Sequence, residues 1–521
     1  MSELLPTRAT YRPDEPVVIE ARGVTGTLRV RRLGDVVAEY TVDGEFVDLG
    51  LLPPGGYGLE AGQCRTAVEV SDRPGMRYGF VVDYRPDRDL TAVADNVRRL
   101  HLTDVQCYDW AYRHADLLGG GQTYTDALDQ PISLVTVRAL IDAVHEAGAR
   151  ALGYAAVYGV GNAEWPRWSY AALTKPTGES YGLGDFLSLV DPAEPGWLTH
   201  FSADLRAAVE SVGFDGFHLD QYGYPKFARR ADGQRIDVAE SFATLIAFVR
   251  AKLPGARLVF NNVNDFPTWR TAPTRQDAVY IEVWPPHTTL GHLAAVVNRA
   301  RSVADGKPVV IAAYQHVYDT APVDESDRAT AFTMAALYSH GATHLLAGEA
   351  DRILVDPYYV RNHVVEPSTA ALLKRWYDFL VEYGELLGLP DVTGAFAGSY
   401  NDDCEISFAG VAVTEAATPG AIWRRVTAHG DRLVVHLINL ADQDDAEWDA
   451  PRKPIASRPE GTLRIRRAGP DLPRVRVADP DQQPSLVDLD VTEDGDHVAV
   501  TVPAPHIWQL VVIDLLGGGN A

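Results

Sequence analysis

Hydrophobic and polar residues follow three successive patterns along the chain, and the first pattern predicts a small β-sandwich. Between residues 16 and 70 they alternate in short runs, as in TGTLRVRRL and VVAEYTV, and Gly, Pro and Asp separate the runs. Alternation with a period of two is typical of half-buried strands, and turn residues at this spacing are typical of a sandwich. We therefore expect an N-terminal immunoglobulin-like β-sandwich over residues 1–73.

The second pattern predicts a (β/α)₈ TIM barrel over residues 74–388. Continuous hydrophobic runs, typical of parallel strands buried on both faces, alternate here with helical segments such as SLVTVRALIDAVHEAG. The runs lie at 78–84, 104–110, 149–158, 216–222, 257–262, 278–284, 308–314 and 343–348. Eight strand–helix repeats indicate a barrel with some long loops. A doubly wound sheet is the alternative, but no βα turn carries the glycine fingerprint that would favour it.

The third pattern returns to alternation after residue 388. The segments that carry it are EISFAG, RLVVHLINL, GTLRIRRA, HVAVTVP and IWQLVVIDL. They predict a C-terminal β-sandwich over residues 389–521. The expected fold is thus of the α/β class, a TIM barrel flanked by an N-terminal and a C-terminal β-sandwich domain.

Composition and charge narrow the function classes. Hydrophobic residues make up 46% of the 521 residues and charged residues 23%, which is ordinary for a globular protein. The formal net charge of −24 argues against nucleic acid or an anionic membrane as a partner. Cys64, Cys107 and Cys404 are far apart and show no disulfide or metal spacing. Because the chain shows neither a signal peptide nor a membrane-spanning run, we expect a cytoplasmic protein; its oligomeric state is not predicted.

Polar and aromatic residues gather where the predicted barrel strands end, which is where barrels of this kind carry their active sites. The residues at or just beyond these ends are Asp83, Tyr84, Tyr108, Asp109, Trp110, Arg113, His114, Tyr154, Tyr158, His218, Asp220, Gln221, Asn261, Asn262, Asn264, Glu282, Trp284, Tyr314, Gln315, Glu349 and Asp351. Carboxylates and amides suit sugar hydroxyls, and Tyr and Trp rings suit the C–H faces of a sugar. A carbohydrate is therefore the expected ligand.

The stretch GFDGFHLDQYG, residues 213–223, carries the strongest candidate for catalysis. Its hydrophobic strand delivers Asp220 at the strand end, beside His218 and Gln221 as expected hydrogen-bond donors, and Glu282 ends another strand in YIEVWP. Glycoside hydrolysis needs two such carboxyl groups, one ionised and one protonated, and the apolar surroundings of Glu282 favour a raised pKa. Two alternatives remain open at this point: Asp220 as the cap of a turn or helix, and Glu282 in a buried ion pair.

Other chemistries have weaker support in the sequence. Four histidines are candidates for a metal site: His114, His218, His316 and His344. None of them pairs at an HxH or HxxxH spacing, so each is expected to be structural or sugar-contacting, and neither a metal nor another cofactor is predicted. The absence of a GxSxG elbow disfavours a serine hydrolase. The Trp-rich segment AEWPRWSY, residues 163–170, either walls a sugar cleft or packs within its own loop.

Four segments together resemble glycoside hydrolase family 66. They are GFDGFHLDQYG, YDWAYRH at residues 108–114, LVFNNVN at residues 258–264, and YIEVWP. That family contains endo-dextranases and cycloisomaltooligosaccharide glucanotransferases, which are retaining enzymes acting on α-1,6-linked glucan. The resemblance runs through the whole barrel and agrees with the flanking β-domains, although each segment alone is a weak signal.

The resemblance implies a role for each matched residue, with Asp220 as the nucleophile and Glu282 as the acid/base. The expected substrate-binding residues are Asp83, Tyr108, Asp109, His114, His218 and Asn261 from the resemblance, and Trp110, Tyr154, Trp284 and Glu349 from their place at the strand ends. Cyclising members of the family carry a carbohydrate-binding module inserted after the seventh barrel strand. Here that connection, residues 315–327, is short.

The sequence therefore predicts a retaining glycoside hydrolase that cleaves α-1,6-glucosidic linkages of dextran or isomalto-oligosaccharides, with transglycosylation as a side activity. The lack of a signal peptide favours imported isomalto-oligosaccharides over polymeric dextran. One alternative is an α-glucosidase or α-galactosidase on a related barrel. A second is a non-catalytic carbohydrate-binding protein, and the intact pair of Asp220 and Glu282 speaks against it.

Overall fold

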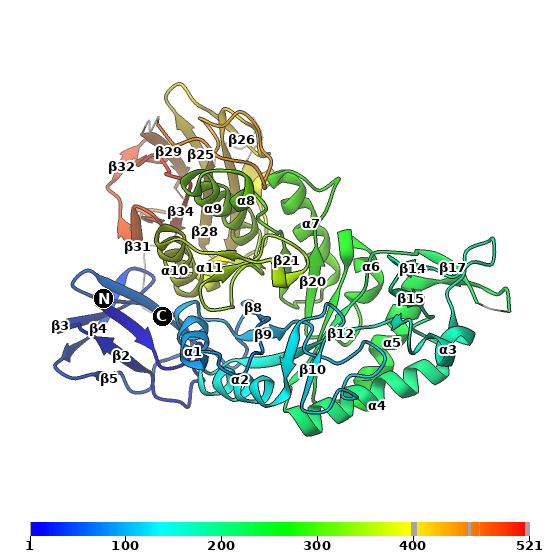
Figure 1. The fold of residues 1–521 in the computed structure, drawn as a ribbon. Coiled ribbons are helices and arrows are strands. Elements are labelled where there is room, and N and C mark those ends of the chain that lie inside the picture. The colour runs from blue at the N-terminus through cyan, green and yellow to red at the C-terminus, as the bar shows by residue number, and fades with distance from the viewer. Residues whose placement is uncertain (1, 231, 397–403, 457–459, 468, 516–521) are drawn as a thin grey trace.

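The computed structural model describes residues 2–230, 232–396, 404–456, 460–467 and 469–515, and an eight-stranded parallel sheet lies at its centre (Figure 1). The strands are β8 (Tyr78–Val81), β9 (Asp104–Cys107), β12 (Arg150–Ala156), β16 (Gly216–Asp220), β19 (Arg257–Asn261), β20 (Ala278–Glu282), β21 (Val309–Ala312) and β22 (Ala342–His344). They lie in chain order from β8 to β22, and every neighbouring pair is parallel. Each predicted run overlaps one of these strands, so the predicted TIM barrel is confirmed.

Helices follow most of the barrel strands. They are α1 (Leu90–Arg99), α2 (Leu134–Glu146), α4 (Pro195–Val212), α5 (Val238–Lys252), α7 (Leu290–Val303), α9 (Val323–Ser339) and α10 (Pro367–Glu382). Between β19 and β20, however, the chain forms only the 3₁₀ turn η2 (Val263–Asp265) and the four-residue α6 (Thr268–Thr271). The expectation of a full helix after every strand is wrong here, because Pro267 interrupts the segment between η2 and α6 and Pro273 follows it. Within the described residues, no helix is both long and apolar enough to cross a membrane.

The barrel closes where β8 approaches the segment that follows β22. The amide of Phe80 donates a hydrogen bond to the carbonyl of Ala347 at 3.3 Å. The next residue, Gly348, has a φ of +152°, and a Cβ there would lie 2.3 Å from backbone atoms of Phe80. Only glycine permits this approach, so Gly348 lets the first and last strands of the barrel meet.

Antiparallel sheets flank the barrel on its N-terminal side, as expected. One sheet contains β1 (Glu3–Pro6), β2 (Val18–Arg22) and β5 (Phe46–Asp48), and the other contains β3 (Gly26–Arg32), β4 (Asp35–Val42), β6 (Gly55–Ala61) and β7 (Cys64–Val70). Their buried residues, among them Leu28, Tyr57 and Val68, form a core of their own. The change to parallel strands falls between β7 and β8, and a domain boundary at residue 73 stays a prediction.

Two further antiparallel-rich sheets follow the barrel. The first contains β25 (Cys404–Phe408), β29 (Gly461–Arg466), β32 (Val491–Asp494) and β33 (His497–Val502), and the second contains β26 (Ala412–Thr414), β27 (Ala421–His429), β28 (Arg432–Asn439), β30 (Arg474–Asp479), β31 (Gln483–Asp488) and β34 (Trp508–Asp514). The predicted segments correspond to β25, β28, β29, β33 and β34. The other five strands, β26, β27, β30, β31 and β32, are not among the predicted segments. In β27 the buried Arg425, which pairs with Asp391 at 2.8 Å, breaks the hydrophobic alternation.

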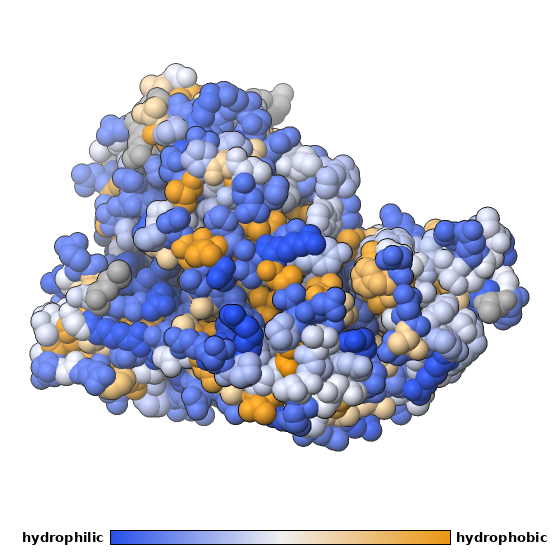
Figure 2. Space-filling model, in the orientation of Figure 1, coloured by the Kyte–Doolittle hydropathy of each residue, from blue (hydrophilic) through white to orange (hydrophobic). Residues whose placement is uncertain are grey.

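Two long connections build a lobe beside the barrel, at the right of Figure 1. After β12 the chain forms a small sheet of β13 (Gly159–Gly161), β14 (Gly182–Leu183) and β15 (Leu187–Leu189), and after β16 it forms a hairpin of β17 (Phe227–Arg229) and β18 (Arg235–Asp237). Backbone hydrogen bonds of 2.8 and 3.0 Å between Thr174 and Arg229 join the two connections. Figure 2 shows hydrophobic side chains gathered over the middle of this face, between the lobe and the rest of the molecule.

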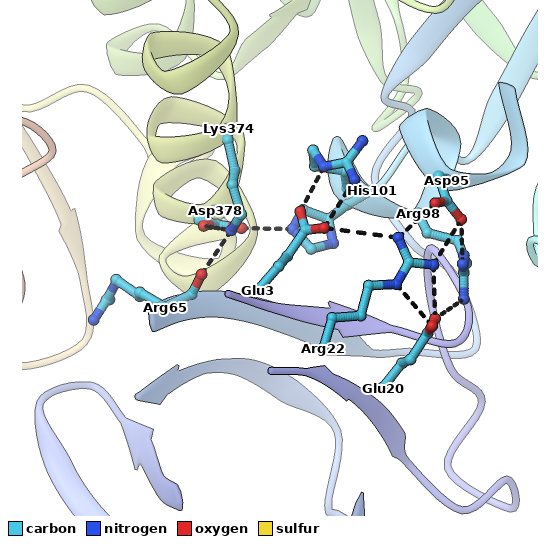
Figure 3. A network of polar contacts seen from close by, with 10 residues as sticks. Glu3, Glu20, Arg22, Arg65, Asp95, Arg98, His101, Lys374 and Asp378 are labelled. Carbon is cyan, nitrogen blue, oxygen red and sulfur yellow. Dashed lines mark hydrogen bonds and ion pairs between the residues drawn. The ribbon is translucent and has the colours of Figure 1, made fainter. Parts of the chain in front are cut away.

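A network of charged side chains holds the N-terminal sheets against the barrel helices (Figure 3). Arg22 on β2 donates to Asp95 on α1 at 2.6 and 3.2 Å and to its neighbour Glu20 at 2.7 and 3.0 Å. Lys374 on α10 donates to the backbone carbonyl of Arg65 on β7 at 2.6 Å. Both helices beside the barrel seam are thus tied to the preceding sheets.

Replacement of Arg22 by alanine is expected to lower the melting temperature by several degrees. The change removes the cation that the partly buried Glu3, Glu20 and Asp95 share, and it leaves each of them with a single arginine partner, Arg98 or Arg99. Arg29→Ala is the matched control, because Arg29 pairs with Glu39 at an exposed site where such pairs contribute about 0–1 kcal/mol. Scanning calorimetry of both variants checks this; equal small shifts would show that the network does not stabilise the fold.

Candidate active site

The ends of the barrel strands surround a cavity of about 250 Å³. Most of the predicted site residues line it: Tyr108, Asp109, His114, Tyr154, His218, Asp220, Asn261, Glu282 and Trp284. They come together because parallel strands carry their C-terminal ends to the same side of a barrel. The residues predicted at the strand ends therefore line one cavity, while their roles stay predictions.

A single amide joins the two candidate catalytic acids. Asp220 ends β16, Asn261 ends the neighbouring β19, and Glu282 ends β20, so the three lie in a row along the rim. Nδ2 of Asn261 donates to Oδ1 of Asp220 at 2.7 Å and to Oε2 of Glu282 at 2.8 Å. These two carboxyl oxygens are therefore at most 5.5 Å apart, the sum of the two hydrogen-bond lengths.

Hydrogen-bond donors surround the carboxyl group of Asp220. The hydroxyl of Tyr154 donates to Oδ2 at 2.7 Å, while Asn261 holds Oδ1. The expectation of donors from His218 and Gln221 is met in part. The backbone N–H of Gln221 hydrogen-bonds to Asp220, whereas the His218 ring bonds to Tyr78 and the side-chain amide of Gln221 donates to backbone carbonyls. Burial raises the pKa of Asp220 to about 6, and the donors limit this rise.

Glu282 holds its proton more tightly than Asp220 does. Burial raises the pKa of Glu282 to about 7, and repulsion by the charge of Asp220 adds to the rise. Trp284 opposes it, because its Nε1 donates to Oε1 of Glu282 at 2.9 Å and favours the ionised form. No lysine or arginine in the described ranges forms an ion pair with Glu282, so the alternative of a buried ion pair is wrong.

Asp109 is a third buried acid in the cavity. Its backbone has a φ of +43°, in the left-handed region that Asp and Asn adopt more readily than other non-glycine residues. Burial raises the pKa of Asp109 well above its usual range, and the negative charges of Asp126 and Asp220 add to the rise. Its surroundings therefore favour the protonated form of Asp109, which can donate a hydrogen bond to a sugar hydroxyl.

The two histidines of the cavity are uncharged near neutral pH. Burial lowers the pKa of His218 to about 3 and that of His114 to about 4. Nδ1 of His218 lies 3.2 Å from the hydroxyl of Tyr78, and its ring stacks on Tyr154 with centroids 6.2 Å apart. Across the part of the chain that the structure describes, no group of three or more His, Cys, Asp and Glu residues is arranged to hold a metal ion.

Three of the predicted binding residues, Asp83, Trp110 and Glu349, lie outside this cavity. Trp110 is fully buried, and its Nε1 donates to a backbone carbonyl of β12 at 3.1 Å, so its ring is closed to a sugar. Asp83 pairs with Arg85 at 2.6 Å. Glu349 forms an ion pair with Arg88 and accepts two backbone N–H groups of the loop after β8. The expectation that these three side chains face a substrate is corrected, because each is engaged by its protein neighbours.

The lobe supplies an apolar wall of the cavity, but not from the Trp-rich segment 163–170, which was one candidate for it. The wall residues are Leu183, Phe186 and Leu187. Phe186 is 36% exposed and so offers an aromatic face to a ligand. The Trp-rich segment 163–170 does not line the cavity; its Trp168 is 3% exposed and packs edge-on against Trp197 with centroids 5.0 Å apart. For this segment the loop-packing alternative holds.

Two tyrosines outside the predicted substrate-binding set also line the cavity; Tyr314 was expected at a strand end, whereas Tyr359 was not predicted. The hydroxyl of Tyr314, just beyond the end of β21, hydrogen-bonds to Glu282. Tyr359, in the 3₁₀ turn η3 (Tyr359–Arg361), stacks on Tyr108 with ring centroids 4.2 Å apart and hydrogen-bonds to Tyr314. Tyr359 lies in a loop without a periodic pattern, and the only sequence signal is a pair of tyrosines beyond the last strand.

Comparison with known sequences places this site within a family. Residues 57–512 match the family model described as glycosyl hydrolase family 66. A cycloisomaltooligosaccharide glucanotransferase of Niallia circulans is 22% identical over 612 aligned positions, which cover 86% of this chain and 63% of the relative. A dextranase of Streptococcus salivarius is 24% identical over 450 positions, which cover 72% of this chain and 54% of the relative. The chain thus spans less than two thirds of the length of either relative.

Comparison with solved structures shows the same fold. A cycloisomaltooligosaccharide glucanotransferase of Paenibacillus sp., solved in complex with cycloisomaltoheptaose, superposes with a TM-score of 0.84 at 20% identity, over 98% of this chain and 100% of that one. An α-amylase of Geobacillus thermoleovorans, in complex with acarbose, gives a TM-score of 0.53 at 11% identity, over 84% of this chain and 98% of that one. The first likeness includes the sheets on both sides of the barrel.

Proposed function

The chain belongs to glycosyl hydrolase family 66 and is a glycoside hydrolase, and on this premise we propose that it cleaves α-1,6-glucosidic linkages in dextran or isomalto-oligosaccharides with retention of configuration. The names of its relatives, a dextranase and cycloisomaltooligosaccharide glucanotransferases, support this substrate class. The cavity also suits a glucan, because its tyrosine and phenylalanine rings match sugar C–H faces and its acids and amides match hydroxyls.

The amide bridge between the two acids is the observation that carries the proposed mechanism. Retaining glycosidases hold their two carboxyl groups about 5–5.5 Å apart, whereas inverting enzymes need roughly 6.5–9.5 Å to admit a water molecule. The limit of 5.5 Å between the nearest oxygens of Asp220 and Glu282 fits the retaining arrangement. Asn261 supports it by holding both groups with one side chain.

In the first proposed step, Asp220 attacks the anomeric carbon from the β face while Glu282 gives its proton to the glycosidic oxygen. The bond from the anomeric carbon to that oxygen breaks, the reducing-side sugar leaves with a free hydroxyl, and a β-glycosyl ester forms on Asp220. The raised pKa of Glu282 suits its role as proton donor, and the donors around Asp220 favour the carboxylate that attacks.

In the second step, the now ionised Glu282 takes a proton from a water molecule, whose oxygen attacks the anomeric carbon from the α face. The ester bond to Asp220 breaks, and the α-anomer is released with both acids back in their starting states. A sugar hydroxyl in place of water would give transglycosylation. The connection between β21 and α9 contains only the short helix α8 (Val317–Thr320) and no inserted module, which favours hydrolysis over cyclisation.

Proton NMR of an isomaltotetraose digest tests the proposal. We expect the α-anomer signal of the new reducing end to appear first and the β-anomer to follow by mutarotation. Dextran should also be shortened, and α-1,4-linked maltotetraose is the matched control that should stay intact. Early β-anomer would overturn retention, and preferential cleavage of maltotetraose or of an α-galactoside would overturn the proposed linkage.

The dependence of kcat/KM on pH is expected to be bell-shaped, with its maximum between about pH 6 and 7, the pKa values of Asp220 and Glu282. Activity falls below this range as the nucleophile gains a proton, and it falls above the range as the acid loses one. Because the two groups interact, the limbs report the pair and not each residue alone. Initial rates on a chromogenic α-isomaltoside check this; a profile that stays flat to high pH would contradict Glu282 as the proton donor.

A further inference from the structure

A second cavity, of about 800 Å³, lies at the opposite end of the barrel from the proposed catalytic site. The N-terminal ends of six barrel strands open into it, among them β8, β12 and β19. The linker at residues 72–75 and the turn between α9 and β22 complete its walls. It therefore borders the barrel and the segment that leads into it from the N-terminal sheets.

The charge of this cavity is opposite to that of the whole chain. Its lining carries six cationic side chains, Arg73, Arg77, Arg150, Arg257, Arg301 and Lys307. Only three carboxylates share the lining, and the chain as a whole has a formal net charge of −24. A concentration of positive charge inside a concave site attracts anions more strongly than the same charges on an open surface.

Most of these cations lack a carboxylate partner within the cavity. In the described part of the chain, the guanidinium groups of Arg73 and Arg150 form no ion pair, and Arg150 is exposed. Among the described residues, Arg301 and Lys307 donate only to backbone carbonyls. The cavity thus holds several donors whose charge is not compensated.

Two buried polar atoms give a second, independent indication of a missing partner. Arg77 is 4% exposed, and its Nη1 binds Glu69 at 2.6 Å, but its Nη2 is buried without a hydrogen-bond partner. The hydroxyl of Tyr338, a fully buried side chain of the same lining, is also without one. Buried polar atoms in native proteins are nearly always hydrogen-bonded, so a ligand or an ordered water in this cavity would satisfy these two atoms.

We propose that this cavity binds a phosphate group, carried by inorganic phosphate or by a phosphate monoester. A tetrahedral dianion has enough oxygens to accept from several guanidinium groups at once, and the planar fork of arginine matches such oxygens in pairs. Arg77, Arg150 and the hydroxyl of Tyr338 are the proposed contacts. Because the site joins the linker to the strand ends, its occupation stabilises the native state over the unfolded chain.

Thermal melting with added phosphate tests the proposal on the whole chain. The melting temperature should rise with sodium phosphate or glucose 6-phosphate, and it should rise less in sodium chloride of equal ionic strength, which controls for screening. Calorimetric titration then compares the two ligands: tighter binding of the ester identifies a sugar phosphate or similar ester as the occupant, and tighter binding of phosphate identifies the free ion. Equal responses to phosphate, ester and chloride would show water in the cavity and overturn the proposal.

Two variants separate binding from folding. Arg150→Glu is expected to weaken binding at least about tenfold, because it removes a donor and adds a negative charge. Tyr338→Phe removes a hydroxyl that has no protein partner, so the fold should be kept while phosphate binding falls. Arg206→Glu makes the same charge change on an exposed site of α4 that is not part of the lining, and it should leave binding unchanged. Wild-type affinity in both Arg150→Glu and Tyr338→Phe would exclude this cavity as the binding site.

Discussion

Asp220→Asn is expected to lower kcat on isomaltotetraose by about 10⁴-fold or more while the protein stays folded. An amide is too weak a nucleophile to form the glycosyl intermediate, so the double displacement is lost. Asparagine has the same shape and can still accept from Tyr154 or Asn261, so packing at the end of β16 is preserved. Steady-state kinetics and a melting curve measure the two effects separately.

Asp83→Asn is the matched control for this variant. Asp83 also follows a barrel strand, but it pairs with Arg85 outside the cavity, so its replacement should leave kcat within about twofold of wild type. A second readout uses azide with Asp220→Ala, where azide attacks the substrate directly from the β face and should give a β-glycosyl azide. Turnover of Asp220→Asn within about tenfold of wild type would remove Asp220 from the role of nucleophile.

Glu282→Gln is expected to lose about 10²–10⁴-fold on isomaltotetraose, because the leaving sugar then departs without a proton. On an α-isomaltoside with a good leaving group, such as 2,4-dinitrophenol, the first step needs no proton and should recover. The covalent intermediate on Asp220 then accumulates, since no base activates the water. Burst kinetics with the activated substrate detect this intermediate.

Azide should restore turnover of Glu282→Gln on the activated substrate, since an anionic nucleophile needs no general base. It attacks the intermediate from the α face and gives an α-glycosyl azide, the opposite stereochemistry to that expected from Asp220→Ala. Equal losses on natural and activated substrates, with no effect of azide, would contradict Glu282 as the acid/base. Asp109 would then be the next candidate, because it is buried in the cavity with a raised pKa, whereas Glu349 is paired with Arg88 outside it.

The barrel strands and the two acids at their ends could be predicted, because the strands recur along the chain as continuous hydrophobic runs. Asp220 and Glu282 each end a continuous hydrophobic run, and the barrel rule brings such ends to one rim. The lack of a full helix after β19 was not predicted from the hydrophobic pattern, because Pro267 and Pro273 interrupt that pattern within a few residues.

The remaining errors lie just beyond the strands, where no period fixes the direction of a side chain. The left-handed backbone at Asp109 redirects the chain, so Asp109 lines the cavity while the next residue, Trp110, is buried away from it. Phe186 and Tyr359 reach the cavity from irregular connections. Their positions depend on long-range packing, which a single sequence does not display.

The joined lobe constrains how descendants of this chain can change their preference for substrates. One connection carries Leu183, Phe186 and Leu187 to the cavity, and the other pairs with it through Thr174 and Arg229. An insertion or deletion in either connection would displace the register of its companion. We therefore expect a graft from a relative to transfer its selectivity only when both loops are exchanged together.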